Sequence, residues 1–501
     1  MYKIIQVAGW VRTARASGKE FMFVEINDGS SLKGLQAVIT KDIEGFEAIS
    51  KVTTGTSLQL KGTLIKSPAQ GQLFELQVSK TDRGHGVKIL GTCEGKTYPL
   101  ARKGHGLEFL REKAHLRPRT NTFGAVTRVR NNLAFATHLF FQTRGFQYIH
   151  TPIITASDCE GAGQMFQVTT LLPEHNEPIG KVPTVEPPKE KKQKKKPVAA
   201  AAEGEEQPVA AVEEKKAPEP FHAKKIDYKK DMFGKPSFLT VSGQLSVENY
   251  CCALSDVYTF GPTFRAENSH TSRHLAEFWM IEPELAFATL QDNMECAEAY
   301  LKFCLQYVIE NNLEDLKFFE QQYEKGLIER LKNVIDTPFR RLPYTEAVEI
   351  LEGLIKEDKV KFENKVYWGV DLASEHEKHL TEKVFGGPII LYNYPKDIKA
   401  FYMKVNEDGK TVQAMDVLVP RIGEIIGGSA REENLERLDK RIEECKLDKQ
   451  AYWWYRELRQ YGTVPHCGFG LGFERLVMMA TGMENIRDVI PFPRAPGQAE
   501  F

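Results

Sequence analysis

The segment FGPTFRAENSHTSRHLAEFWMIEPE, residues 260–284, mixes charged side chains with large apolar ones. Its apolar residues predict two strands of a hairpin, connected by the polar loop ENSHTSRH. The charged residues assigned to the strands are Arg265, Glu267, Glu277, Glu282 and Glu284. Such charges must face water or be paired and hydrogen-bonded, because an isolated buried charge is very costly. By itself the segment slightly favours a sheet face that is exposed to solvent.

A second segment, GFGLGFERL at residues 468–476, favours a binding site over a solvent-exposed face as the explanation of these charges. Its glycines let a ligand approach the backbone of a strand, and Arg475 heads a helix predicted to begin near Phe473. Arg265 and Arg475 together suit a triphosphate, because guanidinium groups bind phosphate oxygens in pairs. The alternating glycines do not form a dinucleotide fingerprint, since the third comes too early for GxGxxG. GTCEGKT at residues 91–97 is one residue too short for a phosphate loop.

The amino-acid composition limits the classes of protein to which the chain can belong. The 501 residues include 67 basic and 68 acidic side chains, so a site for a polyanion must be a local patch. The eight cysteines form no CxxC pair, which favours reduced, buried thiols. The start of the chain resembles no signal peptide, and no stretch reaches the roughly 20 apolar residues of a membrane span. We therefore expect a cytoplasmic protein that is not bound to a membrane.

The chain divides by composition and periodicity. Residues 1–100 contain period-two alternation between turn-rich clusters, which predicts a small antiparallel β-barrel. Residues 101–120 are mixed and basic and are interpreted as a hinge. Residues 121–501 alternate helical and strand-like patterns, beginning with a long helix that stops at Gly145 and the strand-like FQYIHTPIITA. Within them, residues 173–227 are rich in Pro, Ala, Lys and Glu, which predicts a disordered insertion. Its lysine run, 191–196, is interpreted as a solvated linker in preference to an RNA contact.

Three motifs occur together in one order. FRAE followed by RHLAEF resembles motif 2 of the class II aminoacyl-tRNA synthetases, GFGLGFERL resembles motif 3, and Pro152 in FQYIHTPIITASD resembles the motif 1 proline. The barrel is similar to the anticodon-binding OB-fold of the aspartyl, asparaginyl and lysyl subgroup. The resemblance implies an α+β fold: an OB-fold barrel followed by a catalytic domain built on a mainly antiparallel sheet flanked by helices. It also implies a homodimer, with the long helix and Pro152 at a two-fold interface.

The resemblance implies an ATP site with Mg²⁺ as cofactor. Arg265 would contact the α-phosphate, and Arg475 would hold the γ-phosphate with help from His274. Phe278 would stack on adenine with Glu267 nearby, although a core position for Phe278 stays open. Asp416 and Glu424 would bind Mg²⁺. Their spacing of eight residues is one longer than is expected in aspartyl relatives.

The resemblance also implies an amino-acid pocket. Glu160 and Gln244 would receive the α-ammonium group, and Arg431 would meet the side-chain oxygen opposite Glu282. Aspartyl enzymes offer a lysine at the position of Val247 and an aspartate at that of Glu282. A carboxylate at position 282 suits a carboxamide NH₂ and repels a carboxylate, so charge complementarity favours L-asparagine.

For tRNA(Asn), Phe23 would stack an anticodon base, Gln36 would hydrogen-bond a uracil edge, and Arg12 would supply charge. Aromatic residues of a small barrel are as often core residues, so that alternative stays open for Phe23. An aspartyl enzyme of relaxed specificity and a non-catalytic RNA-binding paralogue are the competing interpretations. A tRNA-free asparagine synthetase on the same fold would lack the barrel.

Overall fold

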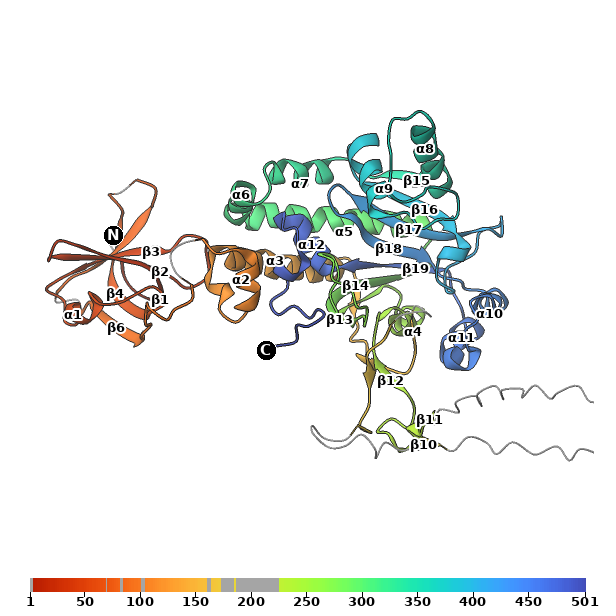
Figure 1. Cartoon of the computed structure of the whole chain (residues 1–501), viewed down its shortest axis with the longest axis horizontal. Helices are drawn as coiled ribbons and strands as arrows, with labels where there is room; N and C mark the ends of the chain where they lie inside the picture. The colour runs from red at the N-terminus through yellow and green to blue at the C-terminus, as the bar shows by residue number, and fades with distance from the viewer. Residues whose placement is uncertain are drawn as a thin grey trace, which may run out of the picture.

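The computed structural model describes residues 3–68, 70–81, 84–100, 104–159, 164–172, 184–185 and 225–501. A small β-barrel at the N-terminus and a larger domain of sheet and helices lie at opposite ends of the view in Figure 1. The predicted α+β class, with an OB-fold barrel and a mainly antiparallel catalytic sheet, is confirmed.

The barrel is closed by a pairing between its first and fourth strands. Its order is β1-β2-β3-β5-β4, and β1 pairs with β4 along residues 3–10. Alternate residues point inward, and the inner ones, such as Val24, Ala37 and Leu60, are fully buried. The barrel elements are β1 (Lys3–Ser17), β2 (Phe21–Asn27), β3 (Leu35–Thr40), α1 (Phe46–Ile49), β4 (Ser57–Lys66), β5 (Phe74–Val78) and β6 (Gly86–Gly91).

The larger domain is built on one eight-stranded sheet, in the order β15-β16-β17-β18-β19-β14-β13-β7. All neighbouring pairs are antiparallel except β15 with β16 and β13 with β7. The strands are β7 (Gln147–Tyr148), β13 (Val257–Phe264), β14 (Glu277–Ala286), β15 (Arg340–Pro343), β16 (Ile389–Pro395), β17 (Thr411–Val419), β18 (Gly423–Ala430) and β19 (His466–Gly472). The smaller strands β8 (Ile154–Thr155), β9 (Gln167–Val168) and β12 (Ser237–Leu239) form a separate sheet, and β10 (Thr184–Val185) pairs with β11 (Lys225–Ile226).

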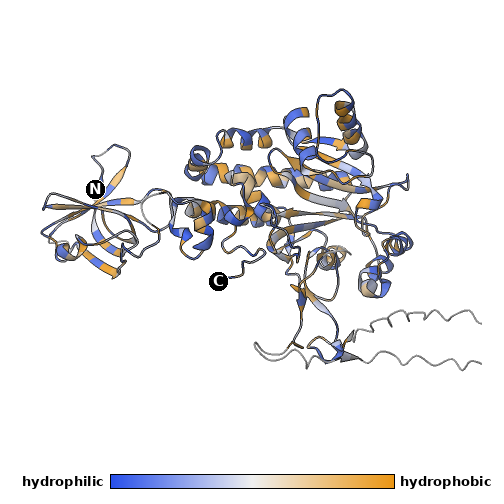
Figure 2. Ribbon diagram, in the orientation of Figure 1, coloured by the Kyte–Doolittle hydropathy of each residue, from blue (hydrophilic) through white to orange (hydrophobic). Residues whose placement is uncertain are grey.

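Long helices cover one face of this sheet (Figure 1). The helix α3 (Asn121–Thr143) begins where the Thr120 hydroxyl accepts a hydrogen bond from the Phe123 N–H, and it ends before Gly145, whose φ is +87°. With α5 (Leu290–Asn311) and α12 (Phe473–Thr481) it buries the main core against β14 and β19. Figure 2 shows hydrophilic and hydrophobic stretches alternating along these helices, as expected for helices with one face in a core.

The remaining helices are shorter than α3 and α5, and several of them also pack against the sheet or the main core. They are α2 (Leu107–Glu112), η1 (Arg117–Arg119), η3 (Tyr228–Lys230), α4 (Gln244–Leu254), α6 (Leu313–Gln322), α7 (Leu327–Asp336), α8 (Tyr344–Lys356), α9 (Ser374–His379), η4 (Leu380–Val384), η5 (Lys396–Ile398), α10 (Leu435–Glu444), η6 (Lys449–Tyr452), α11 (Trp453–Gln460) and η7 (Ile486–Asp488). The elements α2 and η1 fall in the predicted hinge, where Arg111 pairs with Asp488 near the C-terminus. No helix in the described ranges is long and apolar enough to cross a membrane.

Two strand predictions were wrong at their ends. Strand β13 stops at Phe264, so Arg265 and Glu267 follow the strand, although the Arg265 N–H still donates to the Ala276 carbonyl at 3.0 Å. FQYIHTPIITA was predicted as one strand and contains only β7 and β8, because the chain leaves the large sheet after Tyr148 and joins the small one at Ile154. Most of the predicted insertion, 173–227, lies outside the described residues.

Candidate active site

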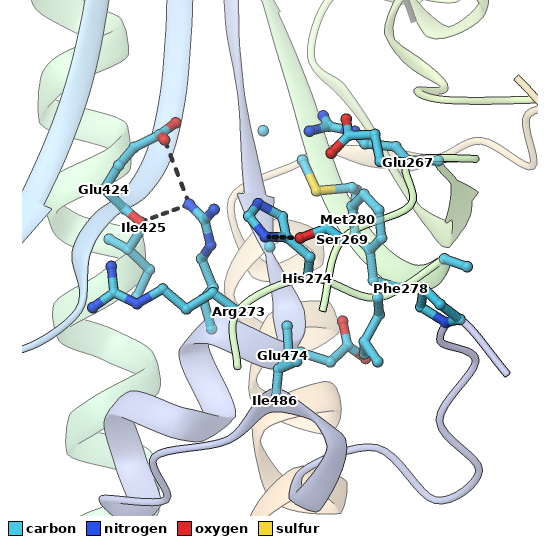
Figure 3. A pocket seen from close by; sticks show the side chains of 17 residues that line it. Glu267, Ser269, Arg273, His274, Phe278, Met280, Glu424, Ile425, Glu474 and Ile486 are labelled. Carbon is cyan, nitrogen blue, oxygen red and sulfur yellow. Dashed lines mark hydrogen bonds and ion pairs between the residues drawn. The ribbon is translucent and has the colours of Figure 1, made fainter. Parts of the chain in front are cut away.

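The hairpin β13–β14 and the loop between its strands form one wall of a cavity of about 810 Å³ that is open to solvent. The N-terminal end of α12 and strand β18 form the opposite wall. The Arg265 guanidinium lies 5.4 Å from the centroid of the Phe278 ring. His274 contacts the Ser269 hydroxyl at 3.1 Å through Nδ1 (Figure 3). Five of the predicted ATP-site residues line this cavity: Arg265, Glu267, His274, Phe278 and Arg475.

The carboxylates of Glu424 and Asp416 both lie close to Gly427, which has no side chain of its own. A Cβ atom at Gly427 would lie 3.0 Å from Glu424 Oε1 and 3.4 Å from Asp416 Oδ1. The pairing of β17 with β18, which carry these two residues, contains a bulge, because its register shifts between Val417 and Leu418. The Arg475 guanidinium donates to the Glu424 carbonyl at 2.8 Å and to its carboxylate at 3.4 Å. The Lys399 ammonium donates to Asp416 at 2.7 Å.

A third carboxylate faces this pair from α9. Glu377 accepts a hydrogen bond from the Glu424 backbone N–H at 3.2 Å. Burial, with the neighbouring Glu424 carboxylate, raises the pKa of Glu377 to about 8. Glu377 therefore holds a proton at neutral pH, while Glu424 and Asp416 offer carboxylate oxygens, the kind of donor that suits Mg²⁺. Within the described ranges, no group of three or more His, Cys, Asp or Glu side chains is placed to hold a metal ion, so it is only the donor chemistry of Glu424 and Asp416 that fits Mg²⁺.

A second cavity, also of about 810 Å³, adjoins the first. The two cavities share Arg265, Met280, Glu424 and Gly470 as lining residues. Gln244, Glu282, Asp416 and Arg431 line the second one. Glu282 is buried and accepts hydrogen bonds from the Ser242 hydroxyl and, at 2.9 Å, from the Gly243 N–H. The predicted amino-acid and metal residues therefore meet beside the predicted ATP site.

A network of buried charged side chains lies behind this second cavity and fixes the position of residues in its wall. Arg431 donates to Glu284 through Nε at 3.2 Å and again through Nη2, while its Nη1 donates to the Ser429 hydroxyl at 2.8 Å. Glu248 accepts from Gln244 at 3.1 Å, so it holds a residue that lines the cavity. The other contacts of Glu248 within hydrogen-bond distance are with Tyr455, Arg459 and His466. Such a network is stable in a core because each charge has a partner.

Comparison with known proteins defines the family. Residues 206–496 match "tRNA synthetases class II (D, K and N)", and residues 5–82 match "OB-fold nucleic acid binding domain". An asparagine–tRNA ligase of Protochlamydia amoebophila is 57% identical over 99% of this chain and 95% of its own length. This chain belongs to the asparagine–tRNA ligase family. A family member from Treponema denticola is 55% identical over 99% of this chain and 96% of its own length.

Solved structures of this family resemble the chain over its whole length. The asparaginyl-tRNA synthetase of Pyrococcus horikoshii complexed with asparaginyl-adenylate superimposes with a TM-score of 0.77. It is 30% identical, and the match covers 99% of this chain and 96% of that one. An aspartyl-tRNA synthetase of Entamoeba histolytica has the same fold at 21% identity, with a TM-score of 0.71 over 99% of this chain and 89% of that one.

One position in the comparison with aspartyl enzymes lies outside the second cavity. Val247, where the aspartyl enzymes are expected to offer a lysine, packs in a small apolar cluster with Cys251 and Val257 and does not line that cavity. The next residue, Glu248, points toward Gln244 and the arginines instead. The spacing of four between Gln244 and Glu248 on one helix is a signal for this contact in the sequence.

Two of the three residues predicted to contact the anticodon lie on the outer face of the barrel. Phe23 and Gln36 occupy outward positions of β2 and β3, opposite Val38 and Glu25, and both are half-buried. The exposed Arg15 guanidinium stacks 5.3 Å from the Phe23 ring centroid. Arg12 is the extra residue of a bulge in β1, and burial lowers its pKa. Glu160 lies outside the described residues.

Several residues at the site were not anticipated from the sequence. Ser242 and the Gly243 N–H orient Glu282, Lys399 pairs with Asp416, and Glu377 adds a third carboxylate. The sequence gives little indication of these contacts, because each residue comes from a segment that is distant in sequence from the residue it contacts. Arg273, in the hairpin loop, lines the first cavity as well.

Proposed function

We propose that this member of the asparagine–tRNA ligase family joins L-asparagine to tRNA(Asn) at the two adjoining cavities, with ATP in the first and asparagine in the second. The observation that carries this proposal is the shared boundary of the cavities at Arg265 and Glu424. A carboxylate of the amino acid and the α-phosphate of ATP would meet there. Proximity of this kind contributes much of a rate enhancement.

In the first step, a carboxylate oxygen of asparagine attacks the α-phosphorus of ATP. The bond from that phosphorus to the oxygen bridging to the β-phosphate breaks, and pyrophosphate leaves with that oxygen. Arg265 stabilises the charge that develops on the α-phosphate, while Arg475 and His274 hold the γ-phosphate. Phe278 stacks on adenine, and Glu267 accepts a hydrogen bond from its amino group.

Mg²⁺ bound by Glu424 and Asp416 would neutralise part of the phosphate charge. Its oxygen ligands are supported by the convergence of the two carboxylates beside Gly427. Lys399, which donates to Asp416 Oδ2 at 2.7 Å, holds that carboxylate in position.

Selection of asparagine rests on Glu282 and Arg431. Glu282 accepts a hydrogen bond from the carboxamide NH₂, Arg431 donates to the carboxamide oxygen, and Gln244 with Glu160 receives the α-ammonium group. An aspartate side chain would meet the Glu282 carboxylate as a like charge, which disfavours it.

In the second step, the terminal 3′-hydroxyl of tRNA(Asn) attacks the carbonyl carbon of the adenylate, and AMP leaves. Phe23, Gln36 and Arg12 on the barrel would contact the anticodon. The chain would act as a homodimer through α3 and the residues around Pro152. Apolar side chains on this surface are exposed in the single chain, including Phe135 at 56% and Tyr148 at 42%. Its substrates are consistent with a cytoplasmic location.

ATP–pyrophosphate exchange with asparagine, aspartate and lysine in parallel, with Mg²⁺ and without tRNA, tests this function. Exchange that depends on asparagine alone is expected. Exchange with aspartate would contradict the role of Glu282, and no exchange with any of the three would favour an RNA-binding paralogue.

A further inference from the structure

A third cavity lies directly behind the proposed ATP site. It encloses about 1060 Å³ open to solvent, and Arg273 and Arg475 line both this cavity and the first one. Five cationic side chains line it, so we call it the cationic cavity: Arg273, Arg330, Lys378, Arg421 and Arg475. They come from the hairpin loop, α7, α9, the β17–β18 turn and α12.

The acidic residues that line this cavity already accept hydrogen bonds or form ion pairs. Glu324 accepts from Arg330 Nε at 2.6 Å and from Arg421 Nη1 at 2.9 Å. Glu382 accepts the Arg421 backbone N–H at 2.8 Å. The Glu484 carboxylate is 85% exposed and lies 3.7 Å from Arg421, where solvent screens the pair. With Glu424, whose carboxylate lies 3.4 Å from Arg475, four carboxylates face the five cations and do not neutralise them.

Two cations in the cavity remain without a carboxylate in contact. Within the described ranges, neither Arg273 nor Lys378 forms an ion pair, and the Arg273 guanidinium donates instead to the Ser374 hydroxyl at 3.0 Å. Burial, followed by repulsion from the Arg273 guanidinium, lowers the pKa of Lys378. Burial and then Arg475 lower the pKa of Arg273. Cations held near one another in this way favour an anion between them.

The backbone conformation of Arg421 also supports the interpretation that this cavity favours an anion. Arg421 has a φ of +68°, a left-handed conformation that is unfavourable for a residue other than glycine. Contacts with Glu382 through its N–H and with Glu324 through its side chain hold it there. The turn thus keeps a cation over the cavity despite its conformational cost.

We propose that the cationic cavity binds pyrophosphate as it leaves the reaction centre. This inference rests on the proposed function, because pyrophosphate is the leaving group of the first step. Its oxygens carry several negative charges, which match the guanidinium forks and the Lys378 ammonium. Arg475 and Arg273 form the wall common to the two cavities, so they contact pyrophosphate on its passage from one to the other.

The variant Lys378→Gln tests this proposal, because Lys378 lines only the cationic cavity. We expect the KM for pyrophosphate in pyrophosphorolysis of the enzyme-bound adenylate to rise about five- to tenfold, the scale of one charge-assisted contact. The KM values for ATP and asparagine should change less than twofold. Lys383→Gln, at an exposed lysine five residues further along, is the matched control and should behave as the unmodified protein does.

Calorimetric titration of the full chain with inorganic pyrophosphate, without ATP or amino acid, measures binding independently of activity. Weaker binding by Lys378→Gln than by Lys383→Gln would support the site even if asparagine exchange failed and the proposed function were wrong. Equal affinities would overturn the proposal. A KM for ATP that rises as much as the KM for pyrophosphate would also overturn it, because the cavity would then be part of the ATP site. A loss confined to tRNA affinity would overturn it as well.

Discussion

Arg265 lies where the two cavities of the proposed active site meet, directly after β13, with its guanidinium over the Phe278 ring. Arg265→Ala should lower asparagine-dependent ATP–pyrophosphate exchange by on the order of a hundredfold or more, because it removes a cation from the charge that develops at the α-phosphate. The exchange rate at saturating ATP measures this effect. Arg437→Ala, at an exposed arginine on α10, is the control. Near-normal exchange by Arg265→Ala would remove this residue from the site.

Glu282 is the residue on which amino-acid selection should depend. Glu282→Gln removes the negative charge and keeps one oxygen that can accept from Ser242 or the Gly243 N–H. The ratio of kcat/KM for asparagine over aspartate should fall about tenfold or more, because like-charge repulsion of aspartate is lost. Exchange measured with both amino acids gives this ratio. An unchanged ratio would mean that selection depends on other groups, such as the network around Glu248.

At the scale of elements, β14 and β19 approach so closely that only glycine fits at residue 468. A Cβ atom there would lie 2.2 Å from Glu284 Oε1 and 2.5 Å from the Pro283 carbonyl oxygen. Gly468→Ala should displace Glu284 from Arg431, lower stability by about 1–3 kcal/mol and raise the KM for asparagine. Gly261→Ala, on β13, has no atom within 4 Å of the added Cβ and is the control. Equal thermal midpoints for the two variants would contradict this account.

The packing of α9 on β18 should make stability depend on pH through Glu377. Its folded pKa is about 8 against an ordinary value of 4.5, so the folded chain holds a proton that the unfolded chain releases. The stability that this proton contributes is complete below about pH 4.5 and is lost as the pH rises toward 8. Without Mg²⁺, the thermal midpoint should fall more steeply between pH 5.5 and 7.5 than in Glu377→Gln. Parallel curves for the two proteins would exclude this proton as the cause.

The hairpin, the helix after Gly472 and the barrel were all predictable from the sequence, because each depends on local periodicity and turn residues. The bulge between β17 and β18, which carry Asp416 and Glu424, was not, since a shift of register is decided between two strands. The surroundings of Val247 were not predictable for a related reason, because whether a helical residue faces a cavity depends on how α4 is rotated against β13 and β14. Contacts such as Lys399 with Asp416 join segments that periodicity cannot relate.

At the scale of the whole molecule, the barrel and the catalytic domain should contribute to different steps. Phe23 lies on the outer face of β2, beneath the Arg15 guanidinium, while the neighbouring Val24 is fully buried in the barrel core. If an anticodon base stacks on Phe23, then Phe23→Ala should lose about 1–3 kcal/mol of tRNA binding. ATP–pyrophosphate exchange needs no tRNA and should be unaffected.

Aminoacylation at limiting tRNA(Asn) and exchange without tRNA, measured on the same preparations, separate these outcomes. Phe74→Ala is a matched control, because Phe74 is a 53% exposed phenylalanine on β5 of the same barrel. A higher KM for tRNA in Phe23→Ala alone would support the outer face as the anticodon contact. Val24→Ala should instead lower the stability of the barrel, since it leaves a cavity in the core. If Phe23→Ala lowers the thermal midpoint as Val24→Ala does, its ring supports the fold of the barrel and the anticodon binds elsewhere.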